Sequence, residues 1–170
     1  MHDGKTIGYW AYLKSPAFLE GVLVNWQAAI LQLMCLITFG TFLYQKGATH
    51  SRSPQHRAHR HHRLKKLGDW TYRNSLFLAF ALLFLATFAL HAYFGWRDYN
   101  SERELIRLPP ISLGNFIVSA KFWFTTLQTW EAEFFAIGFY MVLSIFLRQE
   151  GSPESKPLNS SDQETGEANK

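Results

Sequence analysis

The chain has 170 residues, which is enough for one domain of ordinary size. Hydrophobic residues make up 48% of it, charged residues only 18%, and the formal net charge is +4 at pH 7. This composition excludes a disordered chain, which needs low hydrophobicity, and a collagen-like chain, which needs many more than 11 glycines. The single cysteine, Cys35, excludes an intrachain disulfide framework and a metal site built from several cysteines.

Three apolar segments, taken in chain order, predict three transmembrane helices. The first covers about residues 26–44 and the third about residues 130–148, and each begins at a tryptophan. The middle helix, at about residues 75–96, contains a 19-residue apolar run whose single ionisable side chain is His91. At 1.5 Å per residue such a run spans roughly 28 Å, close to the ~30 Å hydrocarbon core of a bilayer. We therefore expect an all-α, polytopic helical membrane protein.

The chain also resembles itself when it is shifted by 104 residues. Residues 15–52 then overlie residues 119–156, and ten of these 38 pairs are identical, where composition alone would give roughly two or three. Ser15-Pro16 is typical of a helix N-cap followed by the first helical residue. Gly47 and Gly151 stand where a helix C-cap needs a left-handed residue. Each copy is predicted to be one long helix, with an aromatic segment at the interface and the remainder in the bilayer.

This repeat divides the chain into four parts. Residues 1–52 form a first repeat, 53–73 a basic and histidine-rich loop, 74–156 a second repeat, and 157–170 a disordered tail. Equivalent copies cross the membrane in the same direction, so the middle helix must cross in the opposite one. The two termini are therefore expected on opposite sides of the membrane.

Lysine and arginine set the expected orientation. Eight of the 17 fall in residues 45–75, four in 97–121, three in 148–170 and two in 1–25. Because cytoplasmic loops are rich in these residues, we expect the loop over residues 45–73 and the C-terminal tail in the cytoplasm. The N-terminus is then outside.

Three ionisable side chains within the spans are candidates for an intramembrane polar site. Glu131 and Glu133 lie just inside the outer end of the third span, and His91 lies near the outer end of the second. Charged groups near hydrocarbon are costly and usually face a bundle interior or water, so these side chains could bind a cation or carry protons. The alternative, which we favour, is that both carboxylates are solvated at the interface and that the histidine extends toward the headgroups.

The loop after the first span carries several histidines among arginines and lysines. His59, His61 and His62 are the candidate metal ligands, because histidine-rich tracts can bind metal. Neighbouring cations oppose a divalent ion, and no cysteine or carboxylate completes the ligand shell. We therefore favour attraction to anionic lipid headgroups, at about 1 kcal/mol per basic residue. We expect no cofactor and no nucleic-acid partner, since the loop lacks a folded basic platform and interleaved aromatic residues.

Aromatic residues near the predicted helix ends are expected to anchor the helices at the membrane surface. They are Trp26, Trp96, Tyr99, Trp123 and Trp130. The segment GWRDYN at residues 95–100, which holds two of them, is expected to be an anchoring turn where the chain leaves the membrane.

Four segments together resemble a bacterial family of small integral membrane proteins, a domain of unknown function. They are GWRDYNSE at 95–102, PPISLG at 109–114, TWEAEF at 129–134 and LRQEGSPESK at 147–156. The usual form of the family is two tandem units, each with a first span, a Gly-Trp-x-x-Tyr-Asn loop and a Trp-rich second span. The resemblance implies the cytoplasmic (inner) membrane of a bacterium and supplies no activity. It also implies that the first unit here is truncated, or that the native start lies upstream and adds a fourth span.

The sequence contains no nucleophile elbow, phosphate-binding loop or H-E-x-x-H zinc motif, so we do not expect an enzyme. Three thin spans do not easily enclose a polar path. We therefore expect a non-enzymatic structural or interaction component of the inner membrane, which forms a homo-oligomer or binds another membrane protein. One alternative is a small oligomeric transporter or channel. A second is a metal- or pH-responsive membrane sensor that uses the histidine-rich loop.

Overall fold

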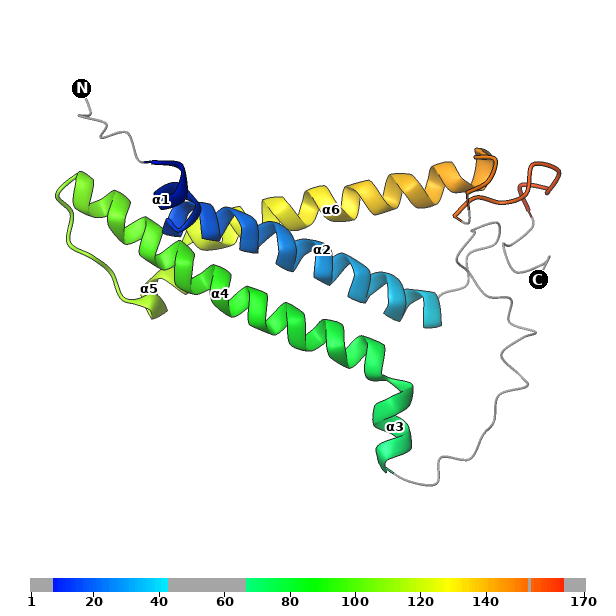
Figure 1. Ribbon diagram of the computed structural model, residues 1–170, viewed down its shortest axis with the longest axis horizontal. Helices are drawn as coiled ribbons and strands as arrows, with labels where there is room; N and C mark the ends of the chain where they lie inside the picture. The colour runs from blue at the N-terminus through cyan, green and yellow to red at the C-terminus, as the bar shows by residue number, and fades with distance from the viewer. Residues whose placement is uncertain (1–7, 43–66, 153, 164–170) are drawn as a thin grey trace. The chain divides into compact units, whose positions relative to one another are not determined.

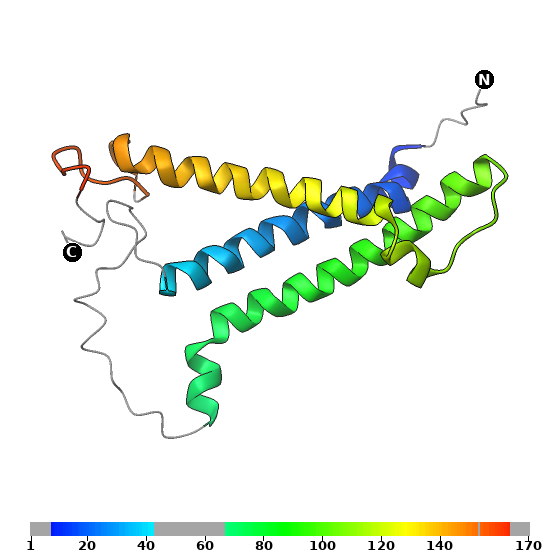
Figure 2. The same ribbon diagram turned by 180° about the vertical axis from the view of Figure 1, so that it is seen from behind.

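The computed structural model describes residues 8–42, 67–152 and 154–163, and every regular element in this part of the chain is an α-helix. The predicted all-α fold is confirmed. Figure 1 and Figure 2 show the helices from opposite sides. In chain order they are α1 (Tyr9–Leu13), α2 (Pro16–Phe42), α3 (Leu67–Arg73), α4 (Ser75–Leu105), α5 (Leu113–Ile117) and α6 (Ala120–Phe146). The candidate metal ligands His59, His61 and His62, and the predicted cap Gly47, lie outside the described residues.

Three of these helices are long and apolar enough to cross a membrane, by length and composition. They are α2 over Pro16–Gly40, α4 over Ser75–Leu105 and α6 over Ala120–Phe146. The prediction of three candidate membrane helices is therefore confirmed. Each of α2 and α6 is one unbroken helix that contains both the aromatic segment and the apolar core of its copy.

Contacts divide the chain into two units, which are described separately. The first unit contains residues Met1–Leu31 and Leu82–Glu131, and the second contains Gln32–Ala81 and Ala132–Lys170. Each long helix contributes one part of its length to each unit. The first unit holds the hydrophobic core, formed by the buried side chains of Ala92, Phe116 and Phe122.

The pair α1–α2 and the pair α5–α6 are built alike. The short helices both have 5 residues, the long helices both have 27, and each bound in the second pair is 104 higher than in the first. Ser15 Oγ accepts a hydrogen bond from the Phe18 N–H at 3.2 Å, and Ser119 Oγ accepts one from the Phe122 N–H at 3.3 Å. Both serines thus satisfy a free N–H in the first turn of a long helix, and the cap predicted at Ser15 is confirmed.

The middle helix is longer than predicted. α4 continues to Leu105 rather than ending at about residue 96, so GWRDYN is helical and the predicted anchoring turn is wrong. The reason lies in two side chains of this segment that bind the returning chain. The Trp96 indole N–H donates to the Ile111 carbonyl at 2.7 Å, and the Asn100 amide both donates to that carbonyl and accepts from the Ile111 N–H, at 3.1 and 2.9 Å. Because these contacts come from consecutive turns of one helix face, the helix must extend through them.

The glycine of the same motif allows close packing in the first unit. A Cβ atom on Gly95 would lie 3.2 Å from Glu20 Cγ on α2 and 3.3 Å from the Phe116 ring on α5. Both distances are tighter than ordinary van der Waals contact. Gly95 therefore lets α2 and α5 approach α4 where a larger residue would hold them apart.

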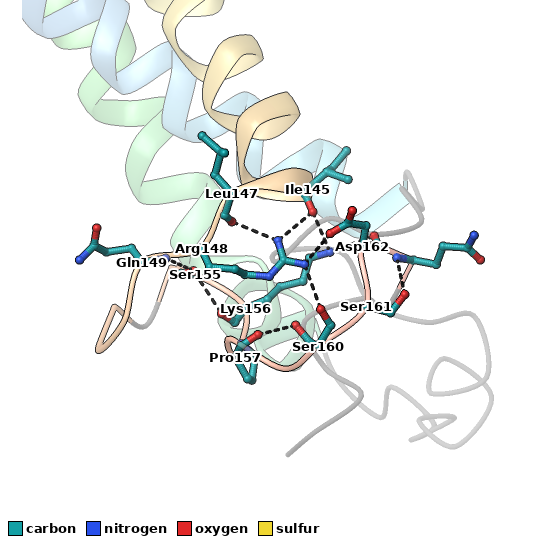
Figure 3. A network of polar contacts seen from close by, with 11 residues as sticks. Ile145, Leu147, Arg148, Gln149, Ser155, Lys156, Pro157, Ser160, Ser161 and Asp162 are labelled. Atoms are coloured by element: carbon teal, nitrogen blue, oxygen red, sulfur yellow. Dashed lines mark hydrogen bonds and ion pairs between the residues drawn. The ribbon is translucent and has the colours of Figure 1, made fainter.

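The segment after α6 folds back on the end of that helix, as Figure 3 shows. Arg148 donates to Asp162 Oδ1 at 2.8 Å and to the Ser160 carbonyl at 3.2 Å, and Lys156 Nζ donates to the Ile145 carbonyl at 3.3 Å. These cations satisfy carbonyls at a helix C-terminus, where the helix dipole also favours positive charge. Ser160 and Asp162, which lie in the tail predicted to be disordered, thus contact the end of α6, and residues 164–170 lie outside the described part.

Gly151 has the left-handed φ of +78° expected of it, but it is not the helix cap. α6 ends at Phe146, and the glycine lies in the turn that follows. The Gln149 N–H donates to Ser155 Oγ at 2.8 Å and so closes this turn. The carbonyl cap is therefore supplied by Arg148 and Lys156 rather than by backbone geometry at the glycine.

Candidate functional site

His91 lies at the centre of a polar cluster in the first unit. It is 0% exposed, and its ring stacks on that of Phe122, with the centroids 5.1 Å apart. Its Nε2 atom lies 3.2 Å from Thr126 Oγ1 on α6, and its Nδ1 atom lies 3.6 Å from Glu20 Oε1 on α2. The expectation that this histidine extends toward the headgroups is wrong, because α2 and α6 supply polar partners for it inside the bundle.

Thr126 determines which nitrogen of His91 carries a proton. The threonine hydroxyl donates its only proton to the Phe122 carbonyl at 2.8 Å, so its oxygen can only accept from the histidine. Nε2 is therefore the protonated nitrogen, and Nδ1 faces the Glu20 carboxyl group. At 3.6 Å this contact is longer than a hydrogen bond, and it is an ion pair only when the histidine is protonated.

Glu20 also lines a cavity of about 180 Å³ in the first unit. Two more carboxylates, Asp98 and Glu102, and the ammonium group of Lys121 line the same cavity. Asp98 and Glu102 lie four residues apart on α4, a spacing that costs about 0.2–0.5 kcal/mol for like charges. In the part of the chain that the structure describes, the side chains of Asp98, Glu102 and Lys121 make no hydrogen bond or ion pair.

Three further polar groups are buried in this unit. The Gln27 side chain is 0% exposed, and neither atom of its amide has a hydrogen-bond partner among the described residues. The Trp130 indole nitrogen is also buried without one. Thr87 is buried as well but is satisfied, because its hydroxyl donates to the Leu83 carbonyl at 2.8 Å. The interior of the first unit is therefore unusually polar for an apolar helical chain.

The predicted trio of His91, Glu131 and Glu133 does not form one site. Glu131 is exposed and Glu133 is half-buried, and the latter's backbone carbonyl accepts a hydrogen bond from the Gln32 side chain at 3.1 Å. The polar partners of His91 are Glu20 and Thr126 instead. Sequence reasoning missed Glu20 because it assigned residues 16–25 to the interfacial part of the first long helix and considered polar side chains only within the spans, whereas α2 carries this carboxylate beside His91.

The predicted anchors fall into two groups. Trp26 is 60% exposed and Trp123 is 40% exposed, so both remain predicted anchors. Trp96 and Tyr99 instead pack against the hydrophobic core, and Trp130 is half-buried. The indole of Trp96 is used for the hydrogen bond to the chain before α5, so its polar edge is not free for the headgroups.

Among the residues that the structure describes, there is no group of three or more histidine, cysteine or acidic side chains that could hold a metal ion. What the arrangement can do is place an imidazole nitrogen and a carboxyl group side by side inside the first unit, next to a cavity that Asp98 and Glu102 also line.

The family comparison agrees with the motifs. A family model described as Domain of unknown function (DUF6766) matches residues 1–167. No curated protein and no solved structure matches the chain. The chain therefore belongs to the DUF6766 family.

Proposed function

We propose that this protein is a multi-pass, non-enzymatic component of a bacterial inner membrane, which acts by associating with itself or with another membrane protein. The observation that supports this most is the apolar surface of its long helices. Leu82 is 70% exposed, Phe135 is 65% exposed and Phe39 is 52% exposed. Side chains of this size need lipid or protein around them. Association with a second membrane protein would bury part of this apolar surface.

The topology is part of this proposal. The matched lengths and caps of α1–α2 and α5–α6 support two equivalent copies, which would cross in parallel with α4 running back between them. The basic loop over residues 45–73 then faces the cytoplasm and the anionic headgroups. The N-terminus is outside, and the C-terminal tail is inside.

Self-association is tested by dilution in lipid. The full chain is labelled with donor and acceptor dyes at an Asn159→Cys position in a Cys35→Ser background and reconstituted in liposomes. Energy transfer should persist when the lipid-to-protein ratio rises tenfold, because a specific complex survives dilution. A single-span helix of unrelated sequence is the control. If energy transfer falls as much as it does for the control helix, the protein does not form a homo-oligomer. Association with a different membrane protein would then be the proposed role.

A small transporter or channel is a second candidate, favoured by the buried cluster of Glu20, His91 and Thr126. Ionisable groups within spanning helices mark ion and proton paths in many membrane proteins. Proton flux in liposomes would test this with Glu20→Gln, which removes the ionisable carboxyl group, against Glu104→Gln, which neutralises an exposed carboxylate on α4. Equal proton flux in the two variants would show that Glu20 is not part of a proton path. The proposed sensor role of the histidine-rich loop concerns residues outside the described part and remains a prediction.

A further inference from the structure

The pairs α1–α2 and α5–α6 are built alike but are not covered alike. In the first unit α5 and α6 pack against α4, whereas the equivalent surface of α1 and α2 is left largely exposed. We infer that this surface of α1 and α2 binds a membrane helix of another polypeptide, which resembles α4 and runs antiparallel to α2. The inference rests on the proposed association and names the face and the kind of partner.

Four side chains of α5 and α6 form the surface that α4 covers. They are Phe116, Phe122, Thr126 and Trp130. At one end of this surface the ring of Tyr99 lies on that of Phe116, with the centroids 5.6 Å apart. At the other end Phe84 lies on Trp130, at 6.1 Å. Because the contacts on α4 descend in number as those on α5 and α6 rise, α4 is antiparallel to α6 in the first unit.

The residues 104 positions earlier form a surface of the same kind, which we call the α1–α2 face. They are Tyr12, Phe18, Val22 and Trp26. The rings of Tyr12 and Phe18 lie 5.5 Å apart at an angle of 62°, and the equivalent rings on α5 and α6 lie 5.5 Å apart at 66°. Despite this match, Tyr12 is 49% exposed, whereas Phe116 is 3% exposed. The α1–α2 face is therefore preformed, but α4 does not cover it as it covers the counterpart.

The one polar position of this surface differs between the copies and defines the partner. On α6 the oxygen of Thr126 accepts a hydrogen bond from His91 Nε2 at 3.2 Å. The equivalent Val22 cannot accept one, so a histidine placed there would be buried without a partner, which is costly. The partner helix should therefore carry an apolar side chain where α4 has His91. A glycine where α4 has Gly95 would allow the same close approach.

A second copy of this chain is a poor source of the helix. The face of α4 that has the required pattern is already buried within its own first unit, since Ala92 is 5% exposed and His91 is 0% exposed. The same face touches α2 and α5 at Gly95. It would have to leave both helices to reach another copy. A helix of a different membrane protein meets no such cost.

The test is the quenching of a dye on the full chain in liposomes by a synthetic helix. The dye is attached at Lys14→Cys, an exposed position between α1 and α2, in a Cys35→Ser background. The probe is the sequence of α4, Ser75–Leu105, with His91→Leu and a short-range quencher at its C-terminus. Quenching should saturate as the peptide-to-protein ratio rises. A quencher at the N-terminus should have little effect, because 31 helical residues separate the two ends by roughly 45 Å.

Variants of the peptide and of the protein locate the contact. The α4 peptide that retains His91 should need about tenfold more peptide for half-saturation, because its imidazole finds no acceptor on Val22. Trp26→Ala in the full chain should weaken binding by about tenfold or more, as loss of an aromatic anchor does. Leu85→Ala is the matched control, a similarly exposed side chain on α4, and it should bind like the unchanged protein. Equal binding by these two protein variants would overturn the site.

Three further outcomes would overturn the inference. Quenching that never saturates would mean that lipid covers the α1–α2 face. Equal binding of a scrambled peptide of the same composition would remove the match to α4. Displacement of the peptide by unlabelled full chain would assign the face to a second copy. Energy transfer between full chains is measured without the peptide, so failure of this inference and failure of the proposed self-association are distinguishable.

Discussion

The two units of this protein differ sharply in what they bury. Apart from Lys156, every buried residue in the described part of the chain belongs to the first unit, including the polar side chains of Gln27, Thr87, His91 and Thr126. The second unit leaves its large apolar side chains exposed along the long helices and concentrates its polar contacts in the segment after α6. The comparison teaches that length and apolar composition are enough to make a candidate membrane helix, whereas a polar site needs packed partners from several helices.

The largest effect is expected from Phe122→Ala in the first unit. This ring is 1% exposed and packs against His91, Phe88 and Phe116. Its loss leaves a cavity in the core, which for a buried phenylalanine costs about 3–5 kcal/mol of unfolding free energy. Denaturant titration in detergent would measure the cost.

Phe135→Ala is the matched control in the second unit, since this side chain is 65% exposed. It should change the unfolding free energy by about 0.5 kcal/mol or less. An equal loss of unfolding free energy in the two alanine variants would contradict the proposed difference between the units.

Gly95→Ala should have the next largest effect. The added methyl group would approach Glu20 Cγ and the Phe116 ring at 3.2 and 3.3 Å, and overpacking of this kind costs about 1–3 kcal/mol. Gly138→Ala on α6, where a Cβ would meet nothing within 4 Å, should be neutral or stabilising, because alanine is the better helix former. The same unfolding titration would compare them, and a neutral Gly95→Ala would show that this close approach is not needed.

Thr126→Val tests the proton assignment at His91. Valine keeps the shape of the side chain but leaves the Nε2–H without an acceptor, which costs about 1–3 kcal/mol in a buried site. Thr126→Ser should recover most of the loss. Nitrogen chemical shifts of the imidazole would report the tautomer directly, and a ring protonated only at Nδ1 in the unchanged protein would contradict the assignment.

The smallest effect is expected from Lys156→Met in the second unit. The variant removes a cation that caps the Ile145 carbonyl, and a charge near a helix C-terminus contributes about 0.3–1 kcal/mol. Amide hydrogen exchange should rise in the last turn of α6 and stay unchanged in α4. Glu150→Gln is an exposed control in the same segment. A uniform rise in exchange would mean that this lysine supports more than the local turn.

The parts of the fold that depend on neighbouring residues could be predicted from the sequence. Three long helices follow from the apolar runs, and the N-cap at Ser15 follows from its local chemistry, which the Phe18 hydrogen bond confirms. The end of α4 could not be predicted in this way. It depends on hydrogen bonds from Trp96 and Asn100 to Ile111, which lies more than ten residues further along the chain.

The candidate site depends on still longer separations. His91 was recognised as an unusual residue, but its partners come from α2 and α6, and no pattern within one helix relates Glu20 to Thr126. The contacts of Ser160 and Asp162 could not be predicted for a similar reason. The polar composition of this segment is typical of disorder, yet Arg148 donates to both residues and Lys156 donates to the Asp162 carbonyl.

The central claim is that three helices cross the membrane, with α2 and α6 parallel and α4 antiparallel to them. Single cysteines at Ser101 and Asn159, in a Cys35→Ser background, test it most directly through labelling with a membrane-impermeant maleimide in intact cells. The account predicts that the Ser101 position is labelled from outside and that the Asn159 position is labelled only after the membrane is permeabilised. Labelling of both positions from the same side would contradict it.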